Sequence, residues 1–220
     1  AHLLNAYHQI SAAESVLIAG GGLVGVELAA EILTHYSSKE LTLVHQGATL
    51  IERNHPLSQR IATRFLQKKG ARIIFNERVK DAHGHTFVTN TGRRLEADIA
   101  FLCTGITSNY AFLQHHLGDA LMNHTIRVNS TLQVVGFPHI FAAGDIAGIE
   151  IEKTAQNAEH QARIVVNNIR ALERDEPLEA YSARKTPMVI SLGKYNGIFE
   201  CGNFVISGMI PAFLKAAIEK

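Results

Sequence analysis

Tryptophan is absent from this sequence, and cysteine occurs only twice in 220 residues, at Cys103 and Cys201. The two cysteines are far apart and show neither zinc-ligand nor redox-pair spacing, so neither kind of site is expected. So few cysteines fit a reducing compartment. The twelve histidines also match no metal-ligand spacing, and we expect no bound metal. The formal net charge is only +1, which gives no reason to expect a nucleic-acid partner.

Long uninterrupted apolar runs are lacking as well. The run 16–26 contains four glycines and stops at Glu27, which makes it too short to cross a bilayer. The first residues show no signal peptide. We therefore expect a protein of the cytoplasm or of a membrane surface. Residues 1–10 read as a helix that enters from earlier sequence, so we expect a portion of a longer chain.

The chain is organised around residues 15–31, SVLIAGGGLVGVELAAE, which predict a buried strand, a tight turn and a helix. Gly20 allows a sharp turn, Gly22 lets a diphosphate approach the main chain, and Gly25 lets helix and strand pack closely. Free amides and the helix dipole then favour phosphate at the start of the helix. In this context the pattern predicts a dinucleotide site rather than a purely structural turn. The residues of that site are Gly20, Gly21, Gly22, Leu23, Val24 and Gly25.

The order of strands and helices predicts an α/β fold with a Rossmann-like dinucleotide-binding domain. After an entering helix at 1–13, residues 14–106 follow βαβ order and include an antiparallel meander near 80–95. Residues 107–178 supply one or two parallel strands and a long helix, too few elements for an independent sheet. Strands outside this sequence are expected to complete that sheet. Residues 179–220 predict strands, within 180–203, and a terminal amphipathic helix over 205–218.

The end of the second predicted strand bears on the choice of nucleotide. An NAD site usually has an acidic residue there, about 20 residues after the glycines, which binds the ribose hydroxyls. This sequence has His45 and Gln46 instead, with neither a carboxylate to repel a 2′-phosphate nor an arginine to bind one. The sequence therefore does not distinguish an NADH site from an NADPH site. His45 is either part of the nucleotide site or a surface histidine.

A second strand-to-turn junction occurs at residues 141–145, FAAGD. Asp145 stands at the carboxyl end of a predicted strand, where a carboxylate is able to accept hydrogen bonds from sugar or ribitol hydroxyls. A capping role is the alternative, and the two roles are compatible.

The predicted helices carry further polar residues with open roles. Glu27 is placed in the first turn after Gly25, where the helix dipole favours an acid whether or not it has a function. Residues 153–161 open the long helix, and their polar side chains face either a ligand or solvent. The terminal helix either docks on the domain, which we favour because it carries little positive charge, or lies on a membrane surface.

Several sequence runs occur together in a familiar order: IAGGGLVGVELAAE, FLCTGITSN, TLQVVGFPHIFAAGDIAG, KTAQNAEHQA and MVISLGKYNGIFECGNFVISG. The chain resembles the two-dinucleotide-binding-domain flavoproteins of the pyridine nucleotide-dependent oxidoreductases. Its last run resembles type II NADH dehydrogenases and, more closely, the ferroptosis-suppressor-type NAD(P)H:quinone oxidoreductases. The resemblance covers nearly the whole chain.

The resemblance implies an FAD-dependent enzyme that transfers hydride from NAD(P)H to flavin and then electrons to an acceptor, expected to be a quinone. Gly20, Gly22 and Gly25 would hold the nicotinamide dinucleotide, and Glu27 would lie near the nicotinamide–flavin contact. Residues 107–178 would be the second part of a split FAD domain. The resemblance implies three further pairs of site residues. They are Thr104 and Gly105 at the crossover between domains, Gly144 and Asp145 at the ribitol, and His160 and Gln161 beside flavin and quinone.

Two departures from the family pattern matter. His160 replaces the first glutamine of a pair in type II dehydrogenases, which puts a conventional quinone site in question. The family's first glycine motif, which binds the ADP part of FAD, is not found before Ser15. A disulfide reductase or NADH oxidase of the same superfamily is the first alternative function, and a non-catalytic NAD(P)-sensing module is the second.

Overall fold

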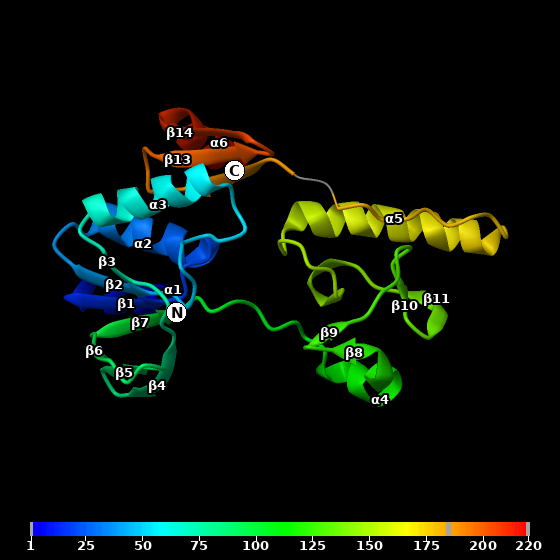
Figure 1. Ribbon diagram of the computed structural model, residues 1–220, viewed down its shortest axis with the longest axis horizontal. Helices are drawn as coiled ribbons and strands as arrows, with labels where there is room; N and C mark the ends of the chain where they lie inside the picture. The colour runs from blue at the N-terminus through cyan, green and yellow to red at the C-terminus, as the bar shows by residue number, and fades with distance from the viewer. Residues whose placement is uncertain (1, 184–185, 219–220) are drawn as a thin grey trace. The chain divides into compact units, whose positions relative to one another are not determined.

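The computed structural model describes the backbone of residues 2–183 and 186–218. The chain forms two compact units (Figure 1). Unit 1 combines Ala1–Gly105 with Pro187–Lys220, and unit 2 comprises Ile106–Thr186. Unit 2 is therefore an insertion into unit 1, and each unit is described separately below.

A four-stranded sheet with the strand order β3-β2-β1-β7 forms the centre of unit 1, and every described pairing in it is parallel. The strands are rich in buried aliphatic side chains, which is typical of parallel sheets that are covered on both faces. The helix α2 connects β1 to β2, and α3 connects β2 to β3, which gives the predicted βαβ order. The elements are α1 (His2–Ala12), β1 (Ser15–Ala19), α2 (Leu23–His35), β2 (Glu40–Val44), α3 (Pro56–Lys68), β3 (Arg72–Ile74) and β7 (Ile99–Leu102).

One face of this sheet is covered by the predicted antiparallel meander, which is confirmed as β4 (Val79–His83), β5 (Thr86–Thr89) and β6 (Arg94–Glu96). Figure 1 shows it on the side opposite to α2 and α3. Its alternating pattern buries Phe87 and Leu95 against Leu17 of the sheet. Glu77, just before β4, accepts hydrogen bonds from Arg93 and Thr89. These bonds, Arg93 first, lower the pKa of Glu77 to about 2.

The other face is covered by α2 and α3, and beyond them lies a second, antiparallel sheet (Figure 1). This sheet consists of β12 (Met188–Ser191), β13 (Gly197–Cys201) and β14 (Phe204–Gly208), followed by α6 (Met209–Ile218). Ile190, Leu192 and Ile198 are buried in the same core as the two helices. The predicted terminal segment 179–220 is thus divided, since residues 187–220 pack within unit 1.

Carboxylates fasten this second sheet to the helices. Glu200 of β13 accepts hydrogen bonds from the His55 amide at 3.0 Å and from the Ser58 hydroxyl at 2.6 Å, at the start of α3. A negative charge at a helix N-terminus is favoured by the helix dipole. Glu31 of α2 accepts a further bond from the Ser191 hydroxyl. The terminal strands are therefore an integral layer of the dinucleotide-binding unit.

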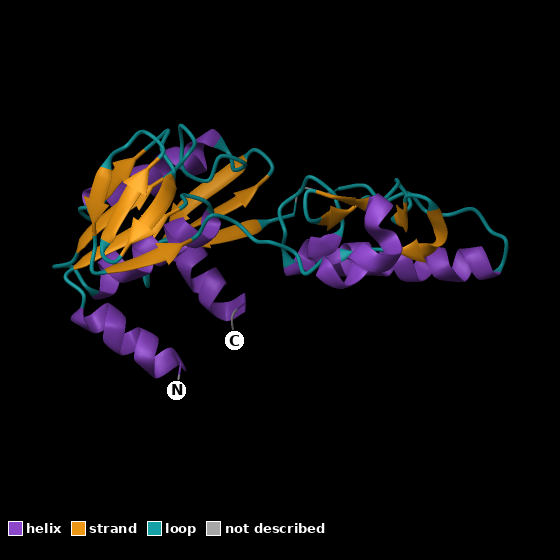
Figure 2. Cartoon of the chain, turned by 90° about the horizontal axis from the view of Figure 1, so that it is seen from below, coloured by secondary structure: helices purple, strands orange, loops and turns teal. Residues whose placement is uncertain are grey.

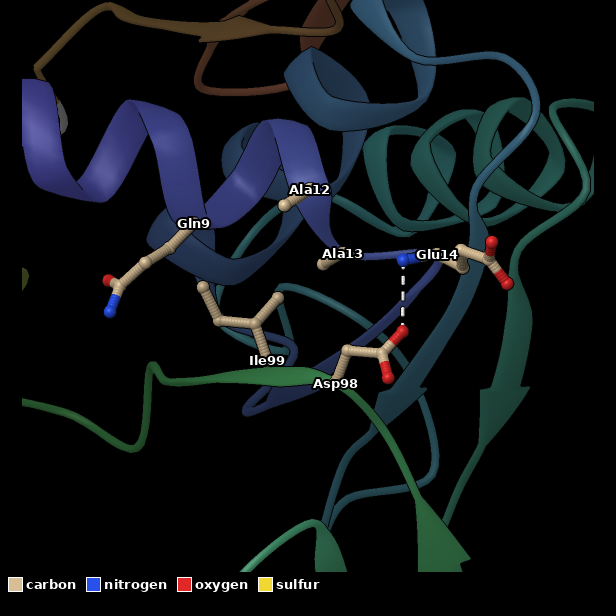
Figure 3. Close-up of a pocket in the computed structure, with 6 residues that line it drawn as sticks. All are labelled: Gln9, Ala12, Ala13, Glu14, Asp98 and Ile99. Atoms are coloured by element: carbon tan, nitrogen blue, oxygen red, sulfur yellow. Dashed lines mark hydrogen bonds between the residues drawn. The ribbon is translucent and has the colours of Figure 1, made fainter.

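The first strand of the sheet is tied to its edge strand by one acid. Asp98 accepts hydrogen bonds from the amides of Glu14 and Ser15 and from the Ser15 hydroxyl, at 2.8–2.9 Å. Figure 3 shows the bond from the Glu14 amide. These bonds, led by the Ser15 amide, lower the pKa of Asp98. The hollow beside it, about 520 Å³, is lined by Gln9, Ala12, Ala13, Glu14, Asp98 and Ile99. The three bonds reach one carboxylate oxygen of Asp98, and they hold the start of β1 beside the start of β7.

Unit 2 contains short two-stranded ladders and one long helix, α5 (Ala155–Glu173), visible in Figure 2. Its small core includes Leu117, Ile126 and Val134. The remaining elements are η1 (Ala111–Leu113), α4 (Gln114–Leu117), η2 (Gly118–Ala120), β8 (Leu121–Met122), β9 (Thr125–Ile126), β10 (Gln133–Val134), β11 (Phe137–Phe141) and η3 (Gly144–Ile146). Within the described residues of unit 2, each ladder has two strands, in the orders β8-β9 and β10-β11.

Candidate functional site

The glycine turn follows β1 as the sequence predicts, and two of its glycines are required by the fold itself. Gly20 has φ +115°, and a Cβ there would lie 2.1 Å from the Cys103 carbonyl oxygen. A Cβ on Gly25 would lie 1.9 Å from the Gly20 carbonyl oxygen. Both positions therefore exclude a side chain for reasons of packing between strand and helix.

Gly22 is different, because a Cβ on it would meet no atom within 4 Å. It is the exposed N-cap residue of α2, and Leu23 and Val24 form the first turn behind it. The space above Gly22 is open, and the first amides of a 13-residue helix have no intrahelical acceptors. This cradle fits a diphosphate, which those amides and the helix dipole would bind.

His45 lies under this turn. The Gly21 amide donates a hydrogen bond to His45 Nδ1 at 3.1 Å. A Cβ on Gly21 would lie 2.8 Å from the His45 ring and 2.5 Å from a methyl group of Leu50. His45 is therefore a structural support of the turn and not a free surface histidine. Gln46, the next residue, is exposed.

The crossover to unit 2 begins directly after β7. The Cys103 amide donates to the Ala19 carbonyl at 2.7 Å, which keeps the end of β7 beside β1. Burial raises the pKa of the Cys103 thiol. Thr104 and Gly105 follow and are exposed, and Gly105 has φ +112°. The two predicted crossover residues are thus the last two residues before unit 2.

Glu27 is the fifth residue of α2, one turn later than predicted, and it has specific partners. Its Oε1 accepts a hydrogen bond from the Ser191 amide at 2.9 Å and forms an ion pair with Lys215 Nζ at 3.1 Å. Both side chains of the pair are about one-quarter exposed. Sequence reasoning did not find Lys215, which is 188 residues away and carries no recognisable motif. The pair joins α6 to α2.

In unit 2 the Gly144–Asp145 turn is held by the long helix. Gly144 has φ +80°, and its amide donates to Gln161 Oε1 at 2.7 Å. Gln161 is only 2% exposed, so its carboxamide is a fixed part of the turn. Asp145 is exposed, and its carboxylate makes no hydrogen bond within the described residues. His160 packs against the ring of Tyr181.

Across the described ranges, no three histidine, cysteine or acidic side chains are grouped so as to hold a metal ion. Within the same ranges, no helix has the length and hydrophobicity needed to cross a membrane.

Residues 3–162 match the family model for pyridine nucleotide-disulphide oxidoreductases, and the chain belongs to this family. It is 29% identical over 219 residues to ferroptosis suppressor protein 1 of Homo sapiens, covering 94% of this chain and 59% of the relative. It is 30% identical over 212 residues to the FAD-dependent oxidoreductase FVFD30 of Flammulina velutipes, covering 93% and 66%. The chain thus spans only part of the length of these relatives.

Solved structures share the fold at low sequence identity. The sulfide:quinone oxidoreductase of Aquifex aeolicus superposes with a TM-score of 0.83 at 16% identity, covering 98% of this chain and 59% of that one. NDH2 of Plasmodium falciparum, in complex with NADH, gives 0.79 at 13% identity, covering 94% and 61%. These similarities confirm the α/β dinucleotide-binding fold class.

Proposed function

We propose that the intact protein is an FAD-dependent NAD(P)H oxidoreductase with a quinone as electron acceptor. The observation that carries the proposal is the open glycine turn at Gly22, which provides amides and space for a diphosphate at the end of a buried strand. Bound flavin and nicotinamide would supply the redox chemistry, and the protein would supply orientation and electrostatics.

The residues of unit 1 would hold the nicotinamide dinucleotide. The amides of residues 21–24 would face the diphosphate, while Gly20 and Gly25 keep the strand and the helix close together. His45 supports the turn through its bond to Gly21. Glu27, fixed by Ser191 and Lys215, would present its carboxylate near the reacting nicotinamide ring. On this proposal, Glu27 would help to orient the reactants.

Unit 2 would supply part of the FAD site. The exposed Asp145 carboxylate would accept hydrogen bonds from ribitol hydroxyls, and Thr104 and Gly105 would line the crossover. Gln161 would act through Gly144 by fixing the turn, whereas His160 remains available to lie near the acceptor. The rest of the FAD site, including the strands that complete its sheet, would come from sequence before residue 1.

The quinone assignment is suggested by the resemblance of the last sequence run to quinone oxidoreductases, and one solved structure of similar fold is named a sulfide:quinone oxidoreductase. Competing acceptors in the superfamily are oxygen and disulfides, and the solved structures of similar fold include a water-forming NADH oxidase of Lactobacillus brevis bound to NADH.

Steady-state turnover of the intact protein tests the function. We expect NAD(P)H oxidation to increase at least about tenfold over the oxygen-only rate when a short-chain ubiquinone is added. Oxidised glutathione serves as the disulfide control. Equal rates with and without quinone would reject the quinone assignment. No oxidation with any acceptor, despite nucleotide binding, would favour a sensing module.

A membrane-surface contact is a second part of the proposal, and it depends on one observation. The helix α6 docks on β12 and β13 through buried Ala212, yet several apolar side chains of β14 and α6 remain exposed. Docking and membrane contact are therefore compatible. The exposed residues are Phe204, Ile206, Met209, Ile210, Phe213 and Leu214.

Vesicle binding of point variants tests this contact better than deletion of the tail, because deletion would remove β14 from the second sheet. Ile210 and Phe213 are 74% and 63% exposed, so their replacement by serine should leave the fold intact. We expect Ile210→Ser/Phe213→Ser to weaken co-sedimentation with phosphatidylcholine vesicles at least about tenfold, since each side chain buries apolar surface. Phe112→Ser, at an equally exposed phenylalanine of unit 2, is the control. Equal binding of all variants would count against the contact.

A further inference from the structure

The loop after β2 folds back onto the glycine turn and is fixed at both sides. Leu50 and Ile51 are buried, and the Ile51 amide donates to the Gly21 carbonyl at 2.8 Å with φ +45° at Ile51. The next carbonyl, that of Glu52, accepts a bond from Gln59 Nε2 of α3 at 3.0 Å. The main chain of Glu52 is therefore held in a defined place next to the dinucleotide site.

This fold places an acid at the end of β2. A Cβ on Gly47 would lie 1.8 Å from Oε1 of Glu52, so the Glu52 carboxylate lies directly against Gly47, three residues after the strand. The Gly47 carbonyl in turn accepts a bond from the Asn76 amide at 3.1 Å, which holds the loop beside the end of β3. Glu52 itself is exposed and is accessible to a ligand.

The end of the second strand is where dinucleotide folds bind the adenosine ribose. A carboxylate there accepts hydrogen bonds from both ribose hydroxyls and repels a 2′-phosphate. His45 and Gln46 provide no such group, whereas Glu52, seven residues beyond His45, places a carboxylate against Gly47, the residue after Gln46. We infer that Glu52 makes the site selective for the nucleotide without the 2′-phosphate. This inference rests on the proposed dinucleotide site.

Two arginines offer the opposite chemistry nearby. Arg60 and Arg64 line a hollow of about 420 Å³ together with Ala48 and Thr49 of the same loop. The lining of that hollow, as far as the described residues define it, starts at Ala48 and does not include residues 45–47 at the strand end. The Glu52 carboxylate, by contrast, contacts Gly47 itself, which is why we assign selectivity to the acid.

Calorimetric titration of the 220-residue chain with ADP-ribose and with 2′-phospho-ADP-ribose tests the inference without requiring flavin or turnover. We expect ADP-ribose to bind at least about tenfold more tightly. Glu52→Gln should reduce this preference to about threefold or less, and Glu52→Arg should reverse it. Glu40→Gln removes an exposed acid at the other end of the same strand and should leave the preference unchanged.

The outcomes distinguish failure of the proposed dinucleotide site from failure of the selectivity assigned to Glu52. Binding of neither ligand would overturn the proposed dinucleotide site and this inference together. Binding of both ligands with a preference that Glu52 variants do not alter would overturn only the inference. A wild-type preference for the 2′-phosphate that disappears in Arg60→Gln/Arg64→Gln would also overturn it, and would transfer the selectivity to the arginines.

Discussion

Replacement of Gly22 by valine is expected to abolish detectable binding of NADH and NADPH, a loss of at least about 100-fold. The valine side chain would occupy the open space above the turn and would block at least two charge-assisted hydrogen bonds, each worth about 1.5–3 kcal/mol. The protein itself has no atom within 4 Å of the new Cβ, and the backbone at Gly22 (φ −73°, ψ −173°) suits a β-branched residue. Nucleotide titration by intrinsic or NADH fluorescence measures the loss.

Stability measurements make this result specific. The melting temperature of Gly22→Val should fall by no more than about 4 °C. The one expected cost to the fold is that valine is a less favourable N-cap residue than glycine. Gly118→Val is the matched control, since Gly118 also has open space and a negative φ (−53°) but lies in unit 2. Gly25→Val should instead damage the fold, given the 1.9 Å approach to Gly20. Unchanged nucleotide affinity in a folded Gly22→Val variant would eliminate the site.

Replacement of Asp145 by alanine in the intact protein is expected to weaken FAD binding at least about tenfold. The loss of hydrogen bonds from ribitol hydroxyls to the charged Asp145 carboxylate would account for an effect of this size. No described residue depends on the carboxylate, so unit 2 should keep its fold. The ratio of flavin to protein absorbance after gel filtration reports the loss.

A close counterpart provides the control. Asp119 also follows a glycine in a three-residue 3₁₀ helix and is also exposed. Asp119→Ala should therefore retain a full complement of flavin. If both variants, or neither, lost flavin, Asp145 would have no special part in the FAD site.

The parts of the fold that were predictable depend on local patterns. The strand, turn and helix at 15–35 follow from glycine spacing and apolar periodicity within one short segment, and the meander follows from alternation and turn residues. The terminal helix was predicted from 205, which is wrong, because Phe204–Gly208 pairs with β13 as a strand. Pro211 was the missed signal, since proline is tolerated in the first turn of a helix but not in its interior.

The candidate site was predictable only where it is contiguous in sequence. The glycine turn and the Gly144–Asp145 turn each occupy one short run. The partners of Glu27 come from two segments of the distant tail, and the position of Glu52 depends on a left-handed residue at Ile51. Neither the pairing across 188 residues nor the unusual φ of an isoleucine has a sequence signature.

The insertion of residues 106–186 into unit 1 has a consequence for biosynthesis. A ribosome delivers Ile190, Leu192 and Ile198 last, although all three complete the hydrophobic core that β1 begins. During synthesis, the apolar faces of α2 and α3 that the second sheet covers therefore stay exposed until the whole insertion has emerged from the ribosome. Premature termination anywhere in that interval would leave exposed apolar surface, of the kind that chaperones recognise, rather than a smaller folded unit.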